Sequence, residues 1–323
     1  MGRKRKHRLD LPERVYFNHG AYYFVHPSGK WEKLDNDYAK AMSRWAELLE
    51  SPTECVTVSD LLNRYLLEVV PGKAPRTQED NRQEIRFLRS FFGDMAITQV
   101  APQHIVAYVN ERRAKTRANR EVALLSNAFN KARLWGVYDG QNPCSVPGIR
   151  NSEKARNRYV TDEEIEKFKE VAPEWLANYV ELKLMLGLRK QDMLCLSWSS
   201  VTENDILVMT RKTSKPLRIV LTEEVKTLLD RLPKNSKNLF ATRSGSTYTL
   251  KGFNSTWQRT MAKYESNGNE RFHEHDLRGK VATDIADPIA AKALLGHSRM
   301  SMTEAYIKQR TVDTVQPHSR RSK

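Results

Sequence analysis

Apolar residues recur at helical spacing through most of the chain, and this periodicity predicts a mainly helical protein. In the first half it predicts helices over residues 58–69, 77–92, 102–113 and 116–135. The last of these helices carries a single apolar stripe, formed by Val122, Leu125, Phe129, Ala132 and Trp135. Such a stripe is typical of a helix face that packs into a core, so we assign these residues to packing.

The first 50 residues follow a different pattern. Short apolar runs at residues 15–17 and 21–25 flank turn-forming residues, and a second turn signal precedes Trp31. We expect a small three-stranded sheet with an aromatic core here. Helical spacing then resumes over residues 37–50.

Turn formers mixed with charges over residues 146–154 indicate an interdomain linker. Beyond it, the sequence Thr161-Asp162-Glu163-Glu164 is a capping box, which predicts the start of a helix. The segments 205–211 and 217–221 predict a β-hairpin. Helices are expected over residues 175–186, 222–232, 250–264, 275–285, 289–295 and 301–309.

Together these elements predict a multidomain protein, mainly α with small β elements. We expect the small sheet and its helix over residues 1–50, a helical domain over 56–147, and a mixed α+β domain with a C-terminal tail over 155–323. A chain of 323 residues is long enough for two or three domains that each bury a core.

Charge narrows the choice of partner. The 54 Lys and Arg residues exceed the 39 Asp and Glu residues, for a net charge of +15. This excess favours a polyanionic partner, with nucleic acid as the leading candidate. The candidate phosphate contacts are Arg3, Lys4, Arg5 and Lys6 in the basic N-terminal arm, and Arg117 and Arg120 off the apolar stripe of the helix over 116–135.

Cys55, Cys144 and Cys195 are isolated and odd in number, which predicts a reducing compartment with no disulfide framework and no zinc site. No apolar run is long enough to span a bilayer, and no apolar stretch follows the basic N-terminus. We therefore expect a soluble cytoplasmic protein with no membrane partner.

The candidate chemistry lies near the C-terminus, where His275-Asp276-Leu277-Arg278 precedes Gly296-His297 and then Tyr306. A tyrosine hydroxyl has a pKa of about 10, so it becomes a nucleophile only beside cations and a proton acceptor. His275, Arg278 and His297 can supply that setting. The arginine fork also matches the non-bridging oxygens of a phosphate, which indicates phosphoryl transfer. His273 and His275 have no third ligand nearby, so this motif does not indicate a metal site.

Two upstream motifs complete the pattern: Leu186-Gly187-Leu188-Arg189, and Arg211-Lys212-Thr213-Ser214-Lys215 before the second strand of the hairpin. In this order the motifs resemble the tyrosine recombinase family, in particular the phage and prophage integrases of the lambda type. The resemblance is strongest over residues 180–310. It also covers a core-binding domain over 56–160 and, most weakly, an arm-type DNA-binding domain over 1–50.

The resemblance implies a site-specific DNA recombinase that needs no cofactor and works through a 3′-phosphotyrosyl bond and a four-way junction. It implies Tyr306 as the nucleophile and His275 as the group that accepts or shares its proton. The implied roles of the other residues are phosphate binding by Arg189 and Arg278, a further hydrogen bond from His297, and protonation of the 5′-oxygen leaving group by Lys212. Lys215 is the less favoured choice for this last role.

The implied partners are double-stranded DNA at core and arm-type attachment sites, further copies of the chain in a homotetramer, and accessory DNA-bending and directionality factors. The implied setting is the cytoplasm of a bacterial host, in association with the nucleoid, where the protein integrates and excises a phage or mobile element. The segment from Arg278 to His297 is a few residues shorter than the family pattern, and Gly279 stands where a bulkier residue is common. Either a helix–helix turn is trimmed, or the two halves of the site are held less well.

Two other functions are compatible with parts of this pattern. An Xer-type resolvase of chromosome or plasmid dimers shares the chemistry, but the separate basic N-terminal sheet argues against it. A catalytically silent DNA-binding accessory protein would keep the domains without cleaving DNA. The full set of six candidate catalytic residues argues against that function.

Overall fold

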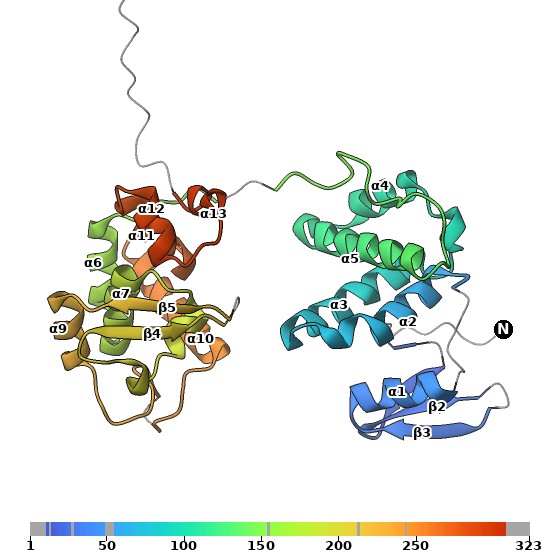
Figure 1. Ribbon diagram of the computed structural model, residues 1–323, viewed down its shortest axis with the longest axis horizontal. Coiled ribbons are helices and arrows are strands. Elements are labelled where there is room, and N and C mark those ends of the chain that lie inside the picture. The colour runs from blue at the N-terminus through green and yellow to red at the C-terminus, as the bar shows by residue number, and fades with distance from the viewer. Residues whose placement is uncertain are drawn as a thin grey trace, which may run out of the picture. The chain divides into compact units, whose positions relative to one another are not determined.

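The computed structural model describes residues 11–12, 14–26, 29–48, 55–153, 156–211, 214–242 and 244–307. The chain divides into two compact units, residues 1–154 and residues 155–323, each with its own apolar clusters (Figure 1). The regular elements in the described residues are helices and small antiparallel sheets, so the mainly helical fold class predicted from the sequence is confirmed.

The first unit begins with the predicted three-stranded sheet. Strands β1 (Val15–Asn18), β2 (Ala21–Val25) and β3 (Trp31–Asp35) pair antiparallel in that order, and helix α1 (Tyr38–Leu48) packs on them. Gly20 has a positive φ of 76° in the tight turn between β1 and β2, which explains the glycine there. The core beneath α1 consists of Leu11, Val15, Tyr22, Phe24, Leu34, Ala41, Met42 and Trp45.

Residues 58–134 are mostly helical, as the periodicity predicted (Figure 1). They contain α2 (Val58–Glu68), α3 (Pro75–Phe92), α4 (Pro102–Glu111) and α5 (Lys115–Leu134), with single-turn 3₁₀ helices at Val70–Gly72 and Ile97–Gln99. The stripe of α5 is buried as expected, apart from Trp135, which is half-buried after the helix ends. The fully buried residues of the stripe are Val122, Leu125, Phe129 and Ala132.

The second unit surrounds one large apolar core with helices and a β-hairpin (Figure 1). Its capping box at Thr161 starts α6 as predicted: the Thr161 side chain accepts from the Glu164 N–H, and the Glu164 carboxylate accepts from the Thr161 N–H. The elements of this unit are α6 (Asp162–Val171), α7 (Glu174–Leu186), α8 (Lys190–Leu194), a 3₁₀ turn (Trp198–Ser200), β4 (Asp205–Met209), β5 (Pro216–Val220), α9 (Glu223–Arg231), α10 (Leu250–Ser266), α11 (Glu274–Asp284), α12 (Pro288–Leu294) and α13 (Met300–Glu304).

Gly187 ends α7 and directs the chain toward Arg189. Its φ is +60°, a left-handed conformation that glycine adopts without strain. A Cβ at this position would lie 2.9 Å from the Leu295 side chain and 3.1 Å from that of Val281. Any larger residue would therefore disturb both the backbone before Arg189 and its packing against the segment after α12.

Two local expectations were wrong. The short helix α8 was missed, because five residues are too few to show a periodicity. The last helix was expected over residues 301–309, but α13 ends at Glu304, and residues 308–309 lie outside the described part of the chain. The Tyr306 N–H bonds to the Thr303 carbonyl at 2.8 Å, the i to i+3 spacing of a tightened final turn. Tyr306 therefore stands just beyond the helix, in a turn.

Candidate active site

Arg278 is the buried centre of the candidate site. It lies on α11 with 1% of its surface exposed. One terminal nitrogen donates to the Gly187 carbonyl, and the other donates to the Leu295 carbonyl at 2.7 Å. The side chain thus ties together the end of α7, α11 and the segment after α12. A guanidinium can hold several acceptors at once because its N–H groups point in fixed, different directions.

His297 lies against Arg278 in the same buried region. Its Nε2 is 3.0 Å from an Arg278 terminal nitrogen, and its Nδ1 is 3.0 Å from the Thr303 hydroxyl. Arginine only donates hydrogen bonds, so Nε2 must be the acceptor and Nδ1 carries the proton. The 3.0 Å contact also shows that the short segment from Arg278 to His297 brings both halves of the site together.

Burial, followed by the charges of Arg278 and Arg189, lowers the pKa of His297 from 6.5 to about 4. The folded chain therefore keeps this imidazole neutral at pH values where the unfolded chain protonates it. Because the pKa of His297 is lower in the folded chain than in the unfolded chain, its contribution to the free energy of unfolding is complete above the unfolded-state pKa of 6.5. This contribution is lost as the pH falls toward the folded-state pKa of about 4.

We therefore predict that the free energy of unfolding falls by about 2 kcal/mol between about pH 7 and about pH 5 on account of His297. Urea denaturation at the two pH values measures the fall. The variant His297→Gln should show a smaller fall, whereas His19→Asn, in the exposed turn after β1, should behave like the parent protein. Equal falls in the parent and in His297→Gln would contradict the prediction.

Tyr306 brings its hydroxyl to the edge of this arrangement. The oxygen lies 3.0 Å from His275 Nε2, and the Arg278 guanidinium carbon lies 5.4 Å from the centre of the tyrosine ring. The ring also lies beside the His297 imidazole, with centroids 5.1 Å apart. A proton acceptor and a buried cation therefore both approach the phenol, which is the setting that a tyrosine nucleophile requires.

The His275 side chain is solvent-exposed at the rim of the site, but neighbouring atoms partly desolvate its imidazole ring. This partial burial is the largest cause that lowers the pKa of His275. After this partial burial, the next largest cause is the positive charge of Lys183, and Glu274 acts in the opposite direction. A lowered pKa favours the neutral imidazole, which is the form that can accept the proton of Tyr306.

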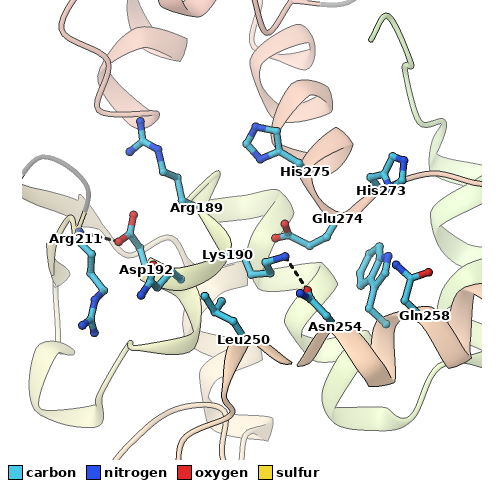
Figure 2. Close-up of a pocket in the computed structure, with 12 residues that line it drawn as sticks. Arg189, Lys190, Asp192, Arg211, Leu250, Asn254, Gln258, His273, Glu274 and His275 are labelled. Carbon is cyan, nitrogen blue, oxygen red and sulfur yellow. Dashed lines mark hydrogen bonds between the residues drawn. The ribbon is translucent and has the colours of Figure 1, made fainter. Parts of the chain in front are cut away.

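Arg189 begins α8 as its N-cap residue. Burial lowers the pKa of Arg278, and the charge of Arg189 lowers it further, as it also does for the pKa of His297 after burial and the charge of Arg278. Together with His275, Arg189 lines a cavity that α10 closes on the other side. Figure 2 shows Arg189 and His275 along one edge of this cavity, and Asn254 and Gln258 of α10 along the other. The structure therefore gathers Arg189, His275, Arg278, His297 and Tyr306 around one site.

The remaining predicted residues are placed differently. Lys212 lies outside the described residues, as do Arg3, Lys4, Arg5 and Lys6. Arg117 and Arg120 are both exposed on α5, and the Arg120 guanidinium forms a 3.0 Å ion pair with Glu153.

Sequence reasoning missed the groups that support the site. Thr303 orients His297, and Lys183 forms a buried ion pair with Glu274, the residue before His275. No periodic signal distinguishes these residues. A lysine in the middle of the strongly apolar helix over 175–186 was the one available sign.

Across the described ranges, no group of three or more His, Cys, Asp or Glu side chains could hold a metal ion. Likewise, none of the helices in the described residues is long and apolar enough to cross a membrane.

Comparisons with known proteins agree with this geometry. Residues 158–312 match the sequence model of the phage integrase family. The chain is 25% identical to the integrase of Escherichia phage HK022, over 95% of this chain and 96% of that protein. It is 27% identical to the integrase of Escherichia phage lambda, over 68% of each chain.

Solved structures show the same fold. A lambda integrase tetramer bound to a Holliday junction superposes with a TM-score of 0.70 at 21% identity, covering 97% of this chain and 99% of that one. The Tn1549 transposon integrase in complex with a circular intermediate DNA superposes with a TM-score of 0.68 at 18% identity, covering 80% and 97%. At identities this low, the structural similarity shows only that the fold is shared.

The fold and the family match define a tyrosine recombinase. Within that class, residues 158–312 match the phage integrase family, and integrases of the lambda type are among the relatives of the chain.

Proposed function

We propose that this protein is a site-specific integrase that cuts and rejoins DNA through a covalent bond between Tyr306 and a 3′-phosphate. The observation that carries the proposal is the contact of 3.0 Å between the Tyr306 hydroxyl and His275 Nε2, beside the buried Arg278 and His297. The contact supports the proposal because a phenol, an imidazole and a buried guanidinium lie within one site.

In the proposed cleavage step, the Tyr306 oxygen attacks the phosphorus and its proton passes to His275. Arg189 and Arg278 stabilise the negative charge that develops on the non-bridging oxygens. The bond to the 5′-oxygen breaks, and Lys212 donates a proton to that leaving oxygen.

Arg278 and His297 are hydrogen-bonded to each other, with His297 accepting at Nε2. For His297 to donate toward a phosphate from this nitrogen, its proton must move from Nδ1 to Nε2. Binding of the phosphate by Arg278 would release Nε2 for this change.

Rejoining reverses the chemistry. A 5′-hydroxyl from a second duplex gives its proton to Lys212, which lost one in the cleavage step, and attacks the phosphorus. The bond from phosphorus to Tyr306 breaks, and Tyr306 leaves with a proton returned from His275. The phosphotyrosyl bond conserves the energy of the phosphodiester, so neither step requires ATP. Two such exchanges in turn, through a four-way junction, recombine two duplexes.

A suicide substrate tests the proposal. The purified protein is mixed, in EDTA, with DNA that carries the attachment site and a nick beside the cleavage position, so that the released fragment diffuses away. A covalent adduct that peptide mass spectrometry maps to Tyr306 is the expected result. DNA binding without an adduct would instead support the catalytically silent accessory protein.

We further propose that residues 1–50 bind arm-type sites, residues 56–147 bind the core site and residues 155–323 cleave it. The basic arm is proposed to contact phosphates through Arg3, Lys4, Arg5 and Lys6, and Arg117 and Arg120 of α5 to contact the core-site backbone. Support comes from the excess of positive charge and from the exposure of both α5 arginines.

Replacing the four arm residues by glutamine should weaken binding to arm-type DNA and leave core-site cleavage measurable. The plot of log affinity against log salt concentration should become shallower by up to about 4, because each lost phosphate contact removes about 0.9 from the slope. A control variant for net charge removes the same four charges from the catalytic unit, by glutamine at the exposed residues Lys167, Lys226, Arg231 and Lys234. An unchanged slope would mean that the arm does not bind phosphates.

The active form is proposed to be a homotetramer on DNA, aided by accessory bending and directionality factors, in the cytoplasm of a bacterial host. Integration and excision of a phage or mobile element distinguish this function from that of an Xer-type resolvase. Activity on a pair of unlike attachment sites would support the integrase, whereas activity only on two identical chromosomal or plasmid sites would support the resolvase.

A further inference from the structure

We infer that the buried lysine Lys183 is a positioning residue of the active site, which holds the backbone before Arg189 and sets the electrostatic environment of His275. This inference rests on the proposed recombinase function. A charge buried in the middle of an apolar helix would then help to keep the catalytic side chains in place.

Lys183 lies on α7 with its side chain fully buried. Its Nζ donates to the Leu188 carbonyl at 2.5 Å and forms a 2.7 Å ion pair with Glu274 Oε1. The Tyr179 hydroxyl, also buried, donates to the same carboxylate oxygen at 2.7 Å. Burying a lysine is costly unless its charge is paired, and here the pairing is completed between α7 and α11.

The hydrogen bond from Lys183 to the Leu188 carbonyl acts on the backbone directly before Arg189. Leu188 follows Gly187, whose carbonyl accepts from Arg278, and it precedes Arg189. Two successive carbonyls are therefore each held by a buried cation, one from α11 and one from α7. Both bonds fix the backbone from which the Arg189 side chain extends, and a small displacement of such a group slows a reaction strongly.

The network also reaches His275. Glu274 is the first residue of α11 and directly precedes His275 in the chain. The groups that act on the imidazole are Lys183 from α7, Glu274, Asp276 and Arg278 from α11, and Tyr306 after α13. Lys183 lowers the pKa of His275 more than Glu274 raises it. Loss of Lys183 therefore raises that pKa whether or not Glu274 keeps its charge.

Lys183→Met and Glu274→Gln form a matched pair, because each breaks the same ion pair and leaves one buried partner. Only Lys183→Met removes the donor to the Leu188 carbonyl. We expect cleavage of the suicide substrate at saturating DNA to slow by about 10- to 100-fold in Lys183→Met and by less than about threefold in Glu274→Gln. Tyr179→Phe, which removes one hydrogen bond to Glu274 without affecting Leu188, should cleave like the parent protein.

The double variant Lys183→Met/Glu274→Gln buries no charge, so it takes the place of Lys183→Met if the single variant does not fold. It should show the same slow cleavage with unchanged DNA affinity. Titration of the His275 ring protons by NMR in the DNA-free protein gives a readout that does not depend on activity. The pKa of His275 should be higher in the Met variants than in the parent.

Equal slowing by Lys183→Met and Glu274→Gln would overturn the inference and mark the network as purely structural. Parental cleavage in the double variant, or an unchanged pKa of His275, would also overturn it. Failure of the proposed function looks different, because the parent protein itself would then form no adduct.

Discussion

Replacing Tyr306 by phenylalanine is expected to reduce covalent cleavage by a factor of at least about 10⁴, because no other group replaces a lost nucleophile. The ring of the variant can keep its contacts with His275 and His297, whose centroids lie 5.3 and 5.1 Å from that of Tyr306. Affinity for attachment-site DNA should therefore remain close to that of the parent protein. The measurement is the rate of adduct formation on the suicide substrate.

Tyr264→Phe is the matched control for this prediction. Tyr264 is fully buried in the same unit, and its hydroxyl has no hydrogen-bond partner among the described residues. Removing that hydroxyl should leave both folding and cleavage intact. If Tyr306→Phe still formed an adduct at a parental rate, another residue would be the nucleophile and the proposed mechanism would be wrong.

Arg278→Lys should have the second-largest effect. A lysine ammonium cannot reproduce the guanidinium fork that reaches the Gly187 carbonyl, the Leu295 carbonyl and His297 together. We expect cleavage to slow by about 10³-fold, because the phosphate loses a bidentate cation and the supporting backbone loosens. The free energy of unfolding should also fall by about 3 kcal/mol, since buried carbonyls lose their donors.

Stability and catalysis are separated in this variant by measuring cleavage at a temperature where its unfolding curve shows a folded protein. Arg231→Lys provides the control, because Arg231 lies on α9 in an exposed ion pair with Glu181. That variant should change neither quantity appreciably. Near-parental cleavage by folded Arg278→Lys would mean that Arg278 serves the fold and not the reaction.

The local elements of this protein are readable from its sequence because their signals are local. The capping box at Thr161, the hairpin over residues 205–221 and the apolar stripe of α5 each depend on neighbours a few residues away. The same holds for the motif order that leads to the family. Local signals do not predict where α13 ends. Tyr306 lies beyond the end of that helix because its hydroxyl contacts His275, which is 31 residues earlier in the chain.

The sequence by itself therefore determined the mainly helical fold class, the β-hairpin, the family and the residue types of the candidate site. The tertiary structure alone decided how these residues support one another. Arg278 meets Gly187 across 91 residues, and Tyr179 meets Glu274 across 95. It also decided that Arg278 sets the proton position on His297 and that Lys183 finds its counter-charge on another helix. Such contacts depend on how helices pack in space, and no spacing along the chain encodes which distant partner a buried polar group will meet.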